Sequence, residues 1–236
     1  MSDKRLTLGS LFDGSGGFPL AGALHGIEPI WASEVEPYPI AVTVSRFPNM
    51  KHLGDVSKIN GAEIEPVDII TFGSPCQDLS VAGKREGIIA GERSSLFFQA
   101  TRIIKEMRNA TNNAYPNVII WENVSGALNS HNGEDFRIAI EEIVNIFQEK
   151  ASVPSVPKGG WAYADEWRGD DWSVAYRVLD AQYWGVPQRR KRIVLIGCAG
   201  AERAGKILFE PKGMSRNFEE SRVSWEDIAD IVKRGS

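Results

Sequence analysis

Residues 6–17, LTLGSLFDGSGG, set the pattern on which the rest of the chain is built. The apolar first half, residues 6–12, has the length of a buried strand and stops at Asp13-Gly14. Glycines at positions 14, 16 and 17 predict a turn, because glycine adopts backbone conformations that other residues avoid. Residues 18–25 are then predicted to form a helix. A strand, a glycine-rich turn and a helix are typical of the first unit of an α/β sheet.

The same alternation of strand and helix continues along the chain. Further strands are predicted at residues 27–33, 67–72, 118–121, 174–179 and 193–198, and further helices at residues 36–47, 95–108 and 135–148. This order predicts an α/β fold with a Rossmann-like, doubly wound, mostly parallel sheet that is covered on both faces.

The domain organisation predicted from this pattern is simple. Residues 1–200 are expected to form one catalytic domain, with a loop insertion of exposed-looking tryptophans at residues 151–173. Residues 201–236 are expected to form a C-terminal tail that is charged and helical over residues 225–233.

Charge and cysteine content narrow the possible classes of protein. The 236 residues include 27 Lys and Arg and 31 Asp and Glu, a net charge of −4, so any contact with nucleic acid needs a local cluster of cations. Two cysteines, Cys76 and Cys198, predict neither a disulfide framework nor a zinc site, and free thiols are typical of the cytosol. No signal peptide, membrane span or membrane partner is expected.

The glycine-rich turn and the acid after the next strand have two interpretations. In a doubly wound sheet the ligand lies outside the carboxyl ends of the strands, where glycines let it approach the backbone. Glu34 ends the second predicted strand and can accept hydrogen bonds from ribose hydroxyls there. The spacing is neither GxGxxG nor a P-loop. The residues therefore indicate either a nucleoside-cofactor site or a tight turn with a solvated strand-end charge.

Two further segments end predicted strands with reactive side chains. Cys76, in GSPCQ at residues 73–77, is either a small buried side chain or a nucleophile, whose pKa a following helix would lower. Glu122, in WENV at residues 121–124, is either a surface charge or an acid that faces the same edge as Cys76. A carboxyl beside a thiol can donate a proton or hold a heterocycle nitrogen.

A cluster of cations precedes the last predicted strand. Residues 188–192, QRRKR, carry four positive charges. Arginine can bind a phosphate or a base carbonyl with two parallel hydrogen bonds. The cluster is therefore either a solvated face or the local positive patch that a DNA-binding protein with this composition would need.

In this order, FDGSGG, GSPCQ, ENV and QRRKR resemble the motifs of the DNA cytosine-C5 methyltransferase family of bacterial or phage type. The resemblance runs from about residue 6 to residue 196. It implies a methyltransferase fold that takes S-adenosyl-L-methionine as cofactor and releases S-adenosyl-L-homocysteine. The residues that it implies for cofactor binding are Phe12, Gly14, Gly16, Gly17, Glu34, Val35, Asp55, Val56, Ser74 and Leu96.

The resemblance also implies a reaction and a substrate. Cys76 would attack C6 of a cytosine flipped out of duplex DNA, and Glu122 would engage N3 and the exocyclic amine. Arg190 and Arg192 would hold the base and its phosphate. The residues implied for other substrate contacts are Pro75, Gln77, Ser80, Arg93, Asn123 and Gln188. The implied function is DNA cytosine-5 methylation in the cytoplasm of a bacterial or phage-infected cell, as part of a restriction–modification or phage system.

The sequence departs from the family at two places. About 40 residues follow the last predicted strand, without the family's final Gly-Asn motif, so a second chain or a missing C-terminal region is expected to complete DNA recognition. Val35 stands where many relatives have an aromatic residue. The alternatives are an RNA cytosine-C5 methyltransferase, a non-catalytic fragment that binds cofactor or a partner chain, and a nicotinamide-dependent oxidoreductase, which the glycine spacing disfavours.

Overall fold

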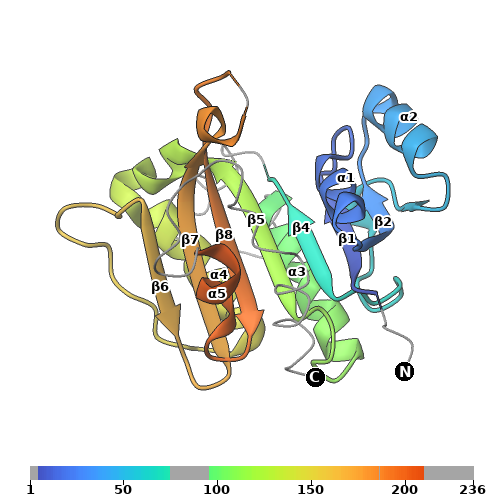
Figure 1. Cartoon of the computed structure of the whole chain (residues 1–236). Helices are drawn as coiled ribbons and strands as arrows, with labels where there is room; N and C mark the ends of the chain where they lie inside the picture. Colours follow the sequence, from blue (N-terminus) through green and yellow to red (C-terminus); the bar gives the residue numbers. More distant parts are fainter. Residues whose placement is uncertain (1–4, 75–95, 186, 210–236) are drawn as a thin grey trace.

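A computed structural model of the chain describes residues 5–74, 96–185 and 187–209. These residues form an eight-stranded sheet with the strand order β3-β2-β1-β4-β5-β8-β7-β6 (Figure 1). The strands are β1 (Thr7–Leu11), β2 (Glu28–Ser33), β3 (Lys51–His52), β4 (Ile69–Phe72), β5 (Val118–Val124), β6 (Ala164–Arg168), β7 (Trp172–Asp180) and β8 (Lys191–Ala199). The α-helices are α1 (Gly17–Leu24), α2 (Pro37–Arg46), α3 (Leu96–Ala110), α4 (Glu134–Phe147) and α5 (Arg203–Leu208).

The sheet has a parallel part and an antiparallel part. Strands β3, β2, β1, β4 and β5 pair in parallel, and β8, β7 and β6 continue the sheet in antiparallel fashion. Parallel neighbours need a long crossover, whereas β7 and β8 are joined by a short connection that contains the 3-10 helix η6 (Ala181–Trp184). The predicted α/β fold is confirmed, with an antiparallel edge that the strand–helix alternation did not indicate.

Helices cover both faces of the sheet. On one face α3 and α4 bury apolar side chains that recur at helical spacing, among them Phe97, Ile104 and Ile140. On the other face α1 packs over β1 and β2, and α5 packs over β7 and β8. Cys198 lies in this second core with no exposed surface, and burial raises the pKa of its thiol to about 12. This cysteine is therefore a packing residue.

The predicted insertion at residues 151–173 is partly regular structure. It contains β6, and two of its tryptophans are buried: Trp161 is 7% exposed and Trp172 is 5% exposed. The Trp161 ring packs edge-on against Phe136 of α4, and its Nε1 donates a hydrogen bond to the Gly133 carbonyl at 2.9 Å. Residues 151–163 contain no helix or strand, as predicted, but the prediction of exposed tryptophans was wrong for Trp161 and Trp172, because long-range aromatic packing overrides the local Pro and Gly content.

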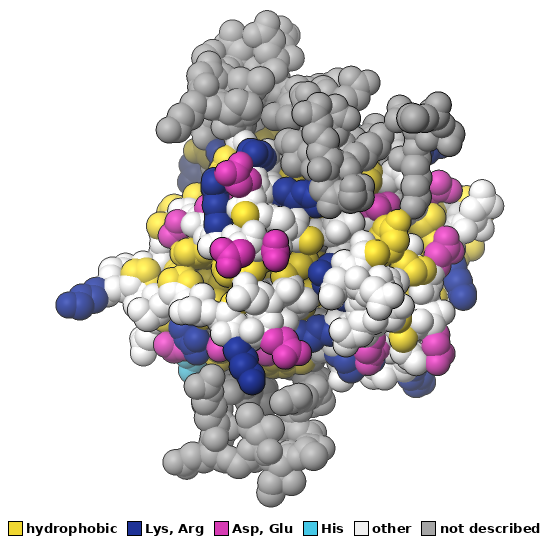
Figure 2. All heavy atoms as spheres, turned by 90° about the horizontal axis from the view of Figure 1, so that it is seen from below, with side chains coloured by type: hydrophobic (Ala, Val, Ile, Leu, Met, Phe, Trp, Pro, Cys, Tyr) yellow, Lys and Arg dark blue, Asp and Glu magenta, His cyan; other side chains and the backbone are white. Residues whose placement is uncertain are grey.

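The carboxyl ends of the parallel strands lie at the upper edge of the sheet in Figure 1, on the same side as the η6 connection. Figure 2 shows the molecule from the opposite end, where Lys and Arg side chains are interspersed with Asp and Glu. None of the helices within the described residues is long and apolar enough to cross a membrane. Residues 201–209 of the predicted tail include α5, and the predicted helix at 225–233 lies outside the described residues.

Candidate active site

The glycine-rich turn after β1 has a backbone that favours glycine. Gly14 and Gly16 have φ values of 57° and 83°, and Gly16 is the residue directly before α1. A Cβ on Gly16 would also lie 2.8 Å from Cγ2 of Thr43, too close for any real contact. Phe12 adopts the same left-handed conformation with φ 55°, which disfavours a residue with a side chain by about 1–2 kcal/mol. Such local strain is often found at functional sites.

Gly17 differs from its neighbours in the turn. Its φ is not in the left-handed range, and a Cβ placed on it would meet no atom of the described residues within 4 Å. Neither the backbone nor the packing of the described residues therefore requires glycine at this position. A ligand that approaches the backbone needs open space there, and a glycine leaves such space because it has no side chain. The turn thus fits a cofactor site.

Glu34 links this turn to the end of β2. Its Oε2 accepts a hydrogen bond from the Gly14 amide at 2.8 Å, and its Oε1 accepts from the amides of Val35 and Glu36 at 2.7 and 3.1 Å. A carboxylate has roughly four acceptor positions, so about one is left for a ligand hydroxyl. Glu34 therefore holds the backbone of the glycine-rich turn in place, a role that the sequence did not indicate, and it also has an acceptor position for a ligand.

The next predicted cofactor residues follow β3. The Ser33 hydroxyl donates to the Gly54 carbonyl at 2.6 Å, which holds this segment beside the end of β2. Asp55 begins the 3-10 helix η1 (Val56–Lys58), and its carboxylate accepts from the Ser57 amide at 2.9 Å and the Ser57 hydroxyl at 2.8 Å. These hydrogen bonds lower the pKa of Asp55. Its carboxylate is thus fixed in orientation by its own turn.

The remaining predicted cofactor residues differ in exposure. Val56 is buried, Leu96 is half-buried at the start of α3, and both pack in the same core. Val35 is 60% exposed at the end of β2. The order of the strands in the sheet reverses between β1 and β4, and ligands of doubly wound folds bind outside the strand ends at such a point.

Asp13 is a residue of this turn that the sequence did not single out. Its carboxyl is 7% exposed, and neither oxygen has a well-formed hydrogen bond within the described residues. Burial, opposed by the nearby Ser10 hydroxyl and assisted by the charge of Glu34, raises the pKa of Asp13 to about 6. The sequence signal for Asp13 was an acidic residue placed between an apolar strand and three glycines.

His52 lies near this turn, and its Nε2 is hydrogen-bonded to Oγ1 of Thr43 at 2.8 Å. Burial lowers the pKa of His52.

Glu122 and Arg192 meet across the β5–β8 pair. Residue 122 pairs with Val194, and residue 192 pairs with Val124, so both side chains lie on one face of the sheet. Nε of Arg192 lies 3.0 Å from Oε1 of Glu122, and Nη2 of Arg190 lies 4.0 Å from the same oxygen. The predicted carboxyl and the two predicted arginines are therefore brought together at the carboxyl end of β5.

The end of β4 is fastened to β5 on both sides of Glu122. Nε1 of Trp121 donates to Oγ of Ser74, and Nδ2 of Asn123 donates to the Ser74 carbonyl, each at 3.3 Å. A Cβ on Gly73 would lie 3.3 Å from Oε2 of Glu122, so glycine leaves room beside this oxygen. Asn123 is buried by these contacts and positions the strand ends. The predicted residues Pro75, Cys76, Gln77, Ser80 and Arg93 lie outside the described residues.

Asp180 closes the connection that carries the basic segment. Its Oδ1 accepts from the Arg190 amide at 3.0 Å and from the Gln182 amide at 3.3 Å, while Oδ2 accepts from Nε2 of Gln182 at 2.8 Å. These hydrogen bonds and the charge of Lys191 lower the pKa of Asp180 in spite of opposing desolvation. Gln188, another predicted substrate residue, is exposed and lines a hollow of about 1400 Å³ next to this connection.

Known proteins match this chain in sequence. Residues 6–146 and 164–234 match the sequence model of the family described as C-5 cytosine-specific DNA methylase. A DNA N-6-adenine-methyltransferase of Escherichia phage P1 is 31% identical over 261 aligned positions, which cover 99% of this chain and 34% of that protein. The type II methyltransferase M.BsuFI of Bacillus subtilis is 32% identical over 193 positions, which cover 82% of this chain and 39% of that protein.

The fold also matches a solved structure. The S. pombe Dnmt2 methyltransferase has a TM-score of 0.53 and 18% identity, and the match covers 83% of this chain and 49% of that chain. The chain thus has the same Rossmann-like fold as this methyltransferase. The chain spans between about a third and a half of the length of these three proteins. All eight strands lie within the matched residues, and the chain belongs to the C-5 cytosine-specific DNA methylase family.

Proposed function

We propose that this chain is the catalytic part of a DNA (cytosine-5-)-methyltransferase that acts on a cytosine flipped out of duplex DNA. The observation that carries the proposal is the pairing of Glu122 with Arg192 at 3.0 Å, beside the glycine that ends β4. Arg192 engages one carboxyl oxygen, and the absence of a side chain on Gly73 leaves space at the other. A carboxyl with one oxygen oriented and one accessible can recognise the N3 and amine edge of a cytosine.

The nucleophile in this proposal is Cys76. Ser74 is held against β5 on both sides of Glu122, and Cys76 follows it by two residues. Covalent geometry therefore keeps the Cα atoms of Ser74 and Cys76 within about 7 Å of each other. The proposed nucleophile is thus two residues from a segment that is held beside the carboxyl that would hold the base. Cys198, with its buried thiol of raised pKa, is unsuited to this role.

The proposed reaction begins when the Cys76 thiolate forms a bond to C6 of the cytosine, which moves an electron pair toward C5. Glu122 accepts a hydrogen bond from the exocyclic amine and shares a proton with N3 as charge develops on the ring. Arg192 keeps the carboxyl in the orientation that this contact needs. Once C5 has gained a methyl group, loss of its proton to a base expels the thiolate and restores the aromatic ring.

The proposed cofactor is S-adenosyl-L-methionine, held by the glycine-rich turn and the ends of β2 and β3. When bound, it supplies the electrophilic methyl group that C5 accepts, and it departs as S-adenosyl-L-homocysteine. Gly17 would let the cofactor approach the backbone, and the free acceptor position of Glu34 would receive a ribose hydroxyl. Asp55, whose carboxylate is already oriented, would lie beside the adenine.

The experiment that tests the proposal is covalent trapping. Duplex DNA in which 5-fluorocytosine replaces every cytosine is incubated with the full chain and S-adenosyl-L-methionine. Fluorine at C5 does not leave as a proton does, so the sulfur–carbon bond should persist and give a denaturant-stable protein–DNA adduct. Cys76→Ser should give no adduct, whereas Cys198→Ser, the matched control, should form it. An adduct that survives in Cys76→Ser would overturn the assignment of the nucleophile.

The base that is methylated needs a test of its own, because the phage P1 relative is named for adenine N-6 methylation. This chain matches 34% of that protein, so the name does not identify the base acted on by the matched part. Mass spectrometry of methylated DNA should find 5-methylcytosine. Detection of N6-methyladenine alone would contradict the proposed reaction. We also propose that a region or chain beyond these residues completes recognition of the target sequence, as the greater length of the relatives suggests.

A further inference from the structure

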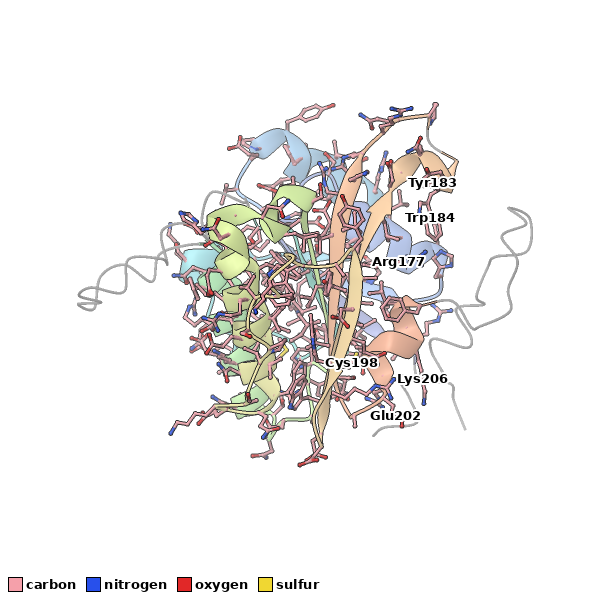
Figure 3. All side chains as sticks on the ribbon, turned by 90° about the vertical axis from the view of Figure 1, so that its left-hand side faces the viewer. Arg177, Tyr183, Trp184, Cys198, Glu202 and Lys206 are labelled. Atoms are coloured by element: carbon pink, nitrogen blue, oxygen red, sulfur yellow. The ribbon has the colours of Figure 1, made fainter. Side chains whose placement is uncertain are left out.

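Among the described residues, α5 covers the lower part of one face of the antiparallel strands. Ala204 of α5 packs there in one core with Ala175, Ile196 and Cys198. In the strand register Arg177 pairs with Val194, and Leu179 pairs with Arg192, so these residues continue the same face upward. Figure 3 shows Arg177 on the same side of the strands as α5, with Tyr183 and Trp184 of η6 above it.

The upper half of this face is the floor of the hollow of about 1400 Å³. Arg177 and Arg192 belong to its lining, together with the η6 connection. Because Glu122 pairs with Val194 on the same face, the hollow begins beside the carboxyl assigned to the target base. It is larger than the roughly 300–1000 Å³ of typical small-molecule sites.

Three aromatic side chains project from the lining of this hollow. Tyr163, Tyr183 and Trp184 are 66%, 58% and 57% exposed, although such rings normally lie against other apolar groups. Nζ of Lys191 lies 5.5 Å from the centre of the Tyr163 ring, and in the strand register both residues lie on the face of Val178, opposite to Arg177. Tyr183 and Trp184 are the rings above Arg177 (Figure 3). Planar surfaces of this kind offer stacking positions for the unpaired bases of a nucleic-acid strand.

The charge of the lining is opposite to that of the chain. Arginines and lysine contribute five cations, whereas Asp180 is the acid among the lining residues and already accepts hydrogen bonds from two backbone amides. The chain as a whole carries a charge of −4. Guanidinium groups on a sheet floor below exposed rings match phosphates linked to bases. A duplex would present the phosphates but would keep its bases stacked away from the rings.

We propose that this hollow binds unstacked nucleotides of the DNA strand next to the target cytosine. Bases would stack on Trp184 and Tyr183, and the connecting phosphates would contact Arg177 and the basic segment. The site lies outside the Glu122–Arg192 pair, and the identity of its ligand rests on the proposed function. By holding neighbouring nucleotides out of the duplex, it would lower the free-energy difference between the stacked and the flipped-out target base.

The test uses a labelled oligothymidylate of about twelve nucleotides, the full-length chain and fluorescence anisotropy. Trp184→Ala should weaken binding by roughly tenfold, because it removes a ring on which a base would stack. Tyr38→Ala is the matched control, because Tyr38 is an exposed aromatic on α2 at the far edge of the sheet. Arg177→Gln should weaken binding and reduce its dependence on salt, whereas Lys206→Gln, on α5 below the hollow, should not.

The outcome separates this proposal from the proposed function. Oligothymidylate contains no cytosine and needs no cofactor, so its binding reports on the hollow even if trapping with fluorocytosine fails. Equal affinity of wild type and Trp184→Ala would overturn the proposal, and covalent trapping of the target base could still succeed. Absence of oligothymidylate binding by wild type, with binding of an acidic peptide to the same residues, would overturn it in favour of a protein partner.

Discussion

Nε of Arg192 and Oε1 of Glu122 lie 3.0 Å apart across two antiparallel strands, with the second carboxyl oxygen next to Gly73. This pair joins two motifs that are 70 positions apart in the sequence. It orients an acid at the edge of the sheet where the glycine-rich turn also lies. The contact therefore brings residues from two separate motifs into one site.

Glu122→Gln should reduce methyl transfer by about 100-fold or more, because an amide cannot share a proton with N3 as a carboxyl does. The side chain is half-buried and the substitution has the same shape, so the folded protein should persist. Single-turnover transfer of labelled methyl groups measures the first effect, and thermal unfolding measures the second. Glu141→Gln, which removes a surface partner of Arg137, is the matched control. Equal activity of both variants would remove Glu122 from the reaction.

Gly17→Ala and Gly16→Ala should have opposite effects. At position 17 a Cβ meets no atom of the part of the chain that the structure describes, so the variant should be as stable as wild type or gain up to about 1 kcal/mol. Its affinity for S-adenosyl-L-methionine should nevertheless fall roughly tenfold, since an added methyl in an occupied site costs about 1–3 kcal/mol. Gly16→Ala should lose about 1–3 kcal/mol of stability, because its φ is 83° and its Cβ would lie 2.8 Å from Thr43.

Denaturation and calorimetry distinguish these two effects. If Gly17→Ala binds the cofactor as tightly as wild type, the open space beside the turn is not part of the cofactor site. If Gly16→Ala is fully stable, the left-handed conformation and the contact with Thr43 do not limit that position.

Glu34→Gln should weaken cofactor binding and also destabilise the turn. The amide side chain keeps one acceptor oxygen for the three backbone amides that the carboxylate now serves. A loss of about 1–2 kcal/mol of stability is expected for hydrogen bonds to a half-exposed charged group. Glu36→Gln is the control, since its exposed side chain is a neighbour of the same strand end. Unchanged stability together with reduced affinity would restrict Glu34 to a ligand contact.

Asp13 should make stability depend on pH. Its pKa is raised to about 6 in the folded protein, above the ordinary value of 3.8, so the folded state holds the proton more tightly than the unfolded state. The stability that this proton contributes is complete below pH 4 and is lost as the pH rises to about 6 and above. Asp13→Asn should therefore be more stable than wild type by about 2–3 kcal/mol at pH 7 and equally stable near pH 4.

Denaturant unfolding of both proteins between pH 4 and 8 checks this prediction. The difference between them isolates Asp13 from His52, whose lowered pKa makes stability change in the opposite direction as the pH falls. A difference that stays constant across the range would show that the Asp13 carboxyl does not titrate there.

Asp180→Ala should weaken DNA binding through the basic segment that it positions. Loss of the hydrogen bonds to the Arg190 and Gln182 amides frees the connection between β7 and β8. The KM for DNA should rise several-fold while cofactor affinity stays unchanged. Asp180→Asn keeps an acceptor oxygen and should restore most of the KM. A KM that is normal in both variants would show that the connection holds its shape without Asp180.

Much of this protein could be predicted from local sequence. All six predicted strands begin and end within a few residues of those in the structure, and the buried face of α3 follows the predicted spacing. Periodicity and turn glycines indicate such elements because they reflect neighbours in the chain. Local sequence did not indicate β6 or the burial of Trp161 within residues 151–173, since both depend on contacts with β7 and α4.

The order of strands and helices, the glycine-rich turn and the motifs of the family can all be recognised in the chain without its fold. The contact of Arg192 with Glu122, the different surroundings of Gly16 and Gly17, and the burial of Asp13 without a well-formed hydrogen bond among the described residues appear only in the folded protein. The difference lies in the range of the interactions. Backbone preference and hydrophobic period act between residues close in sequence, whereas register, burial and charge pairing arise between segments that only the folded sheet brings together.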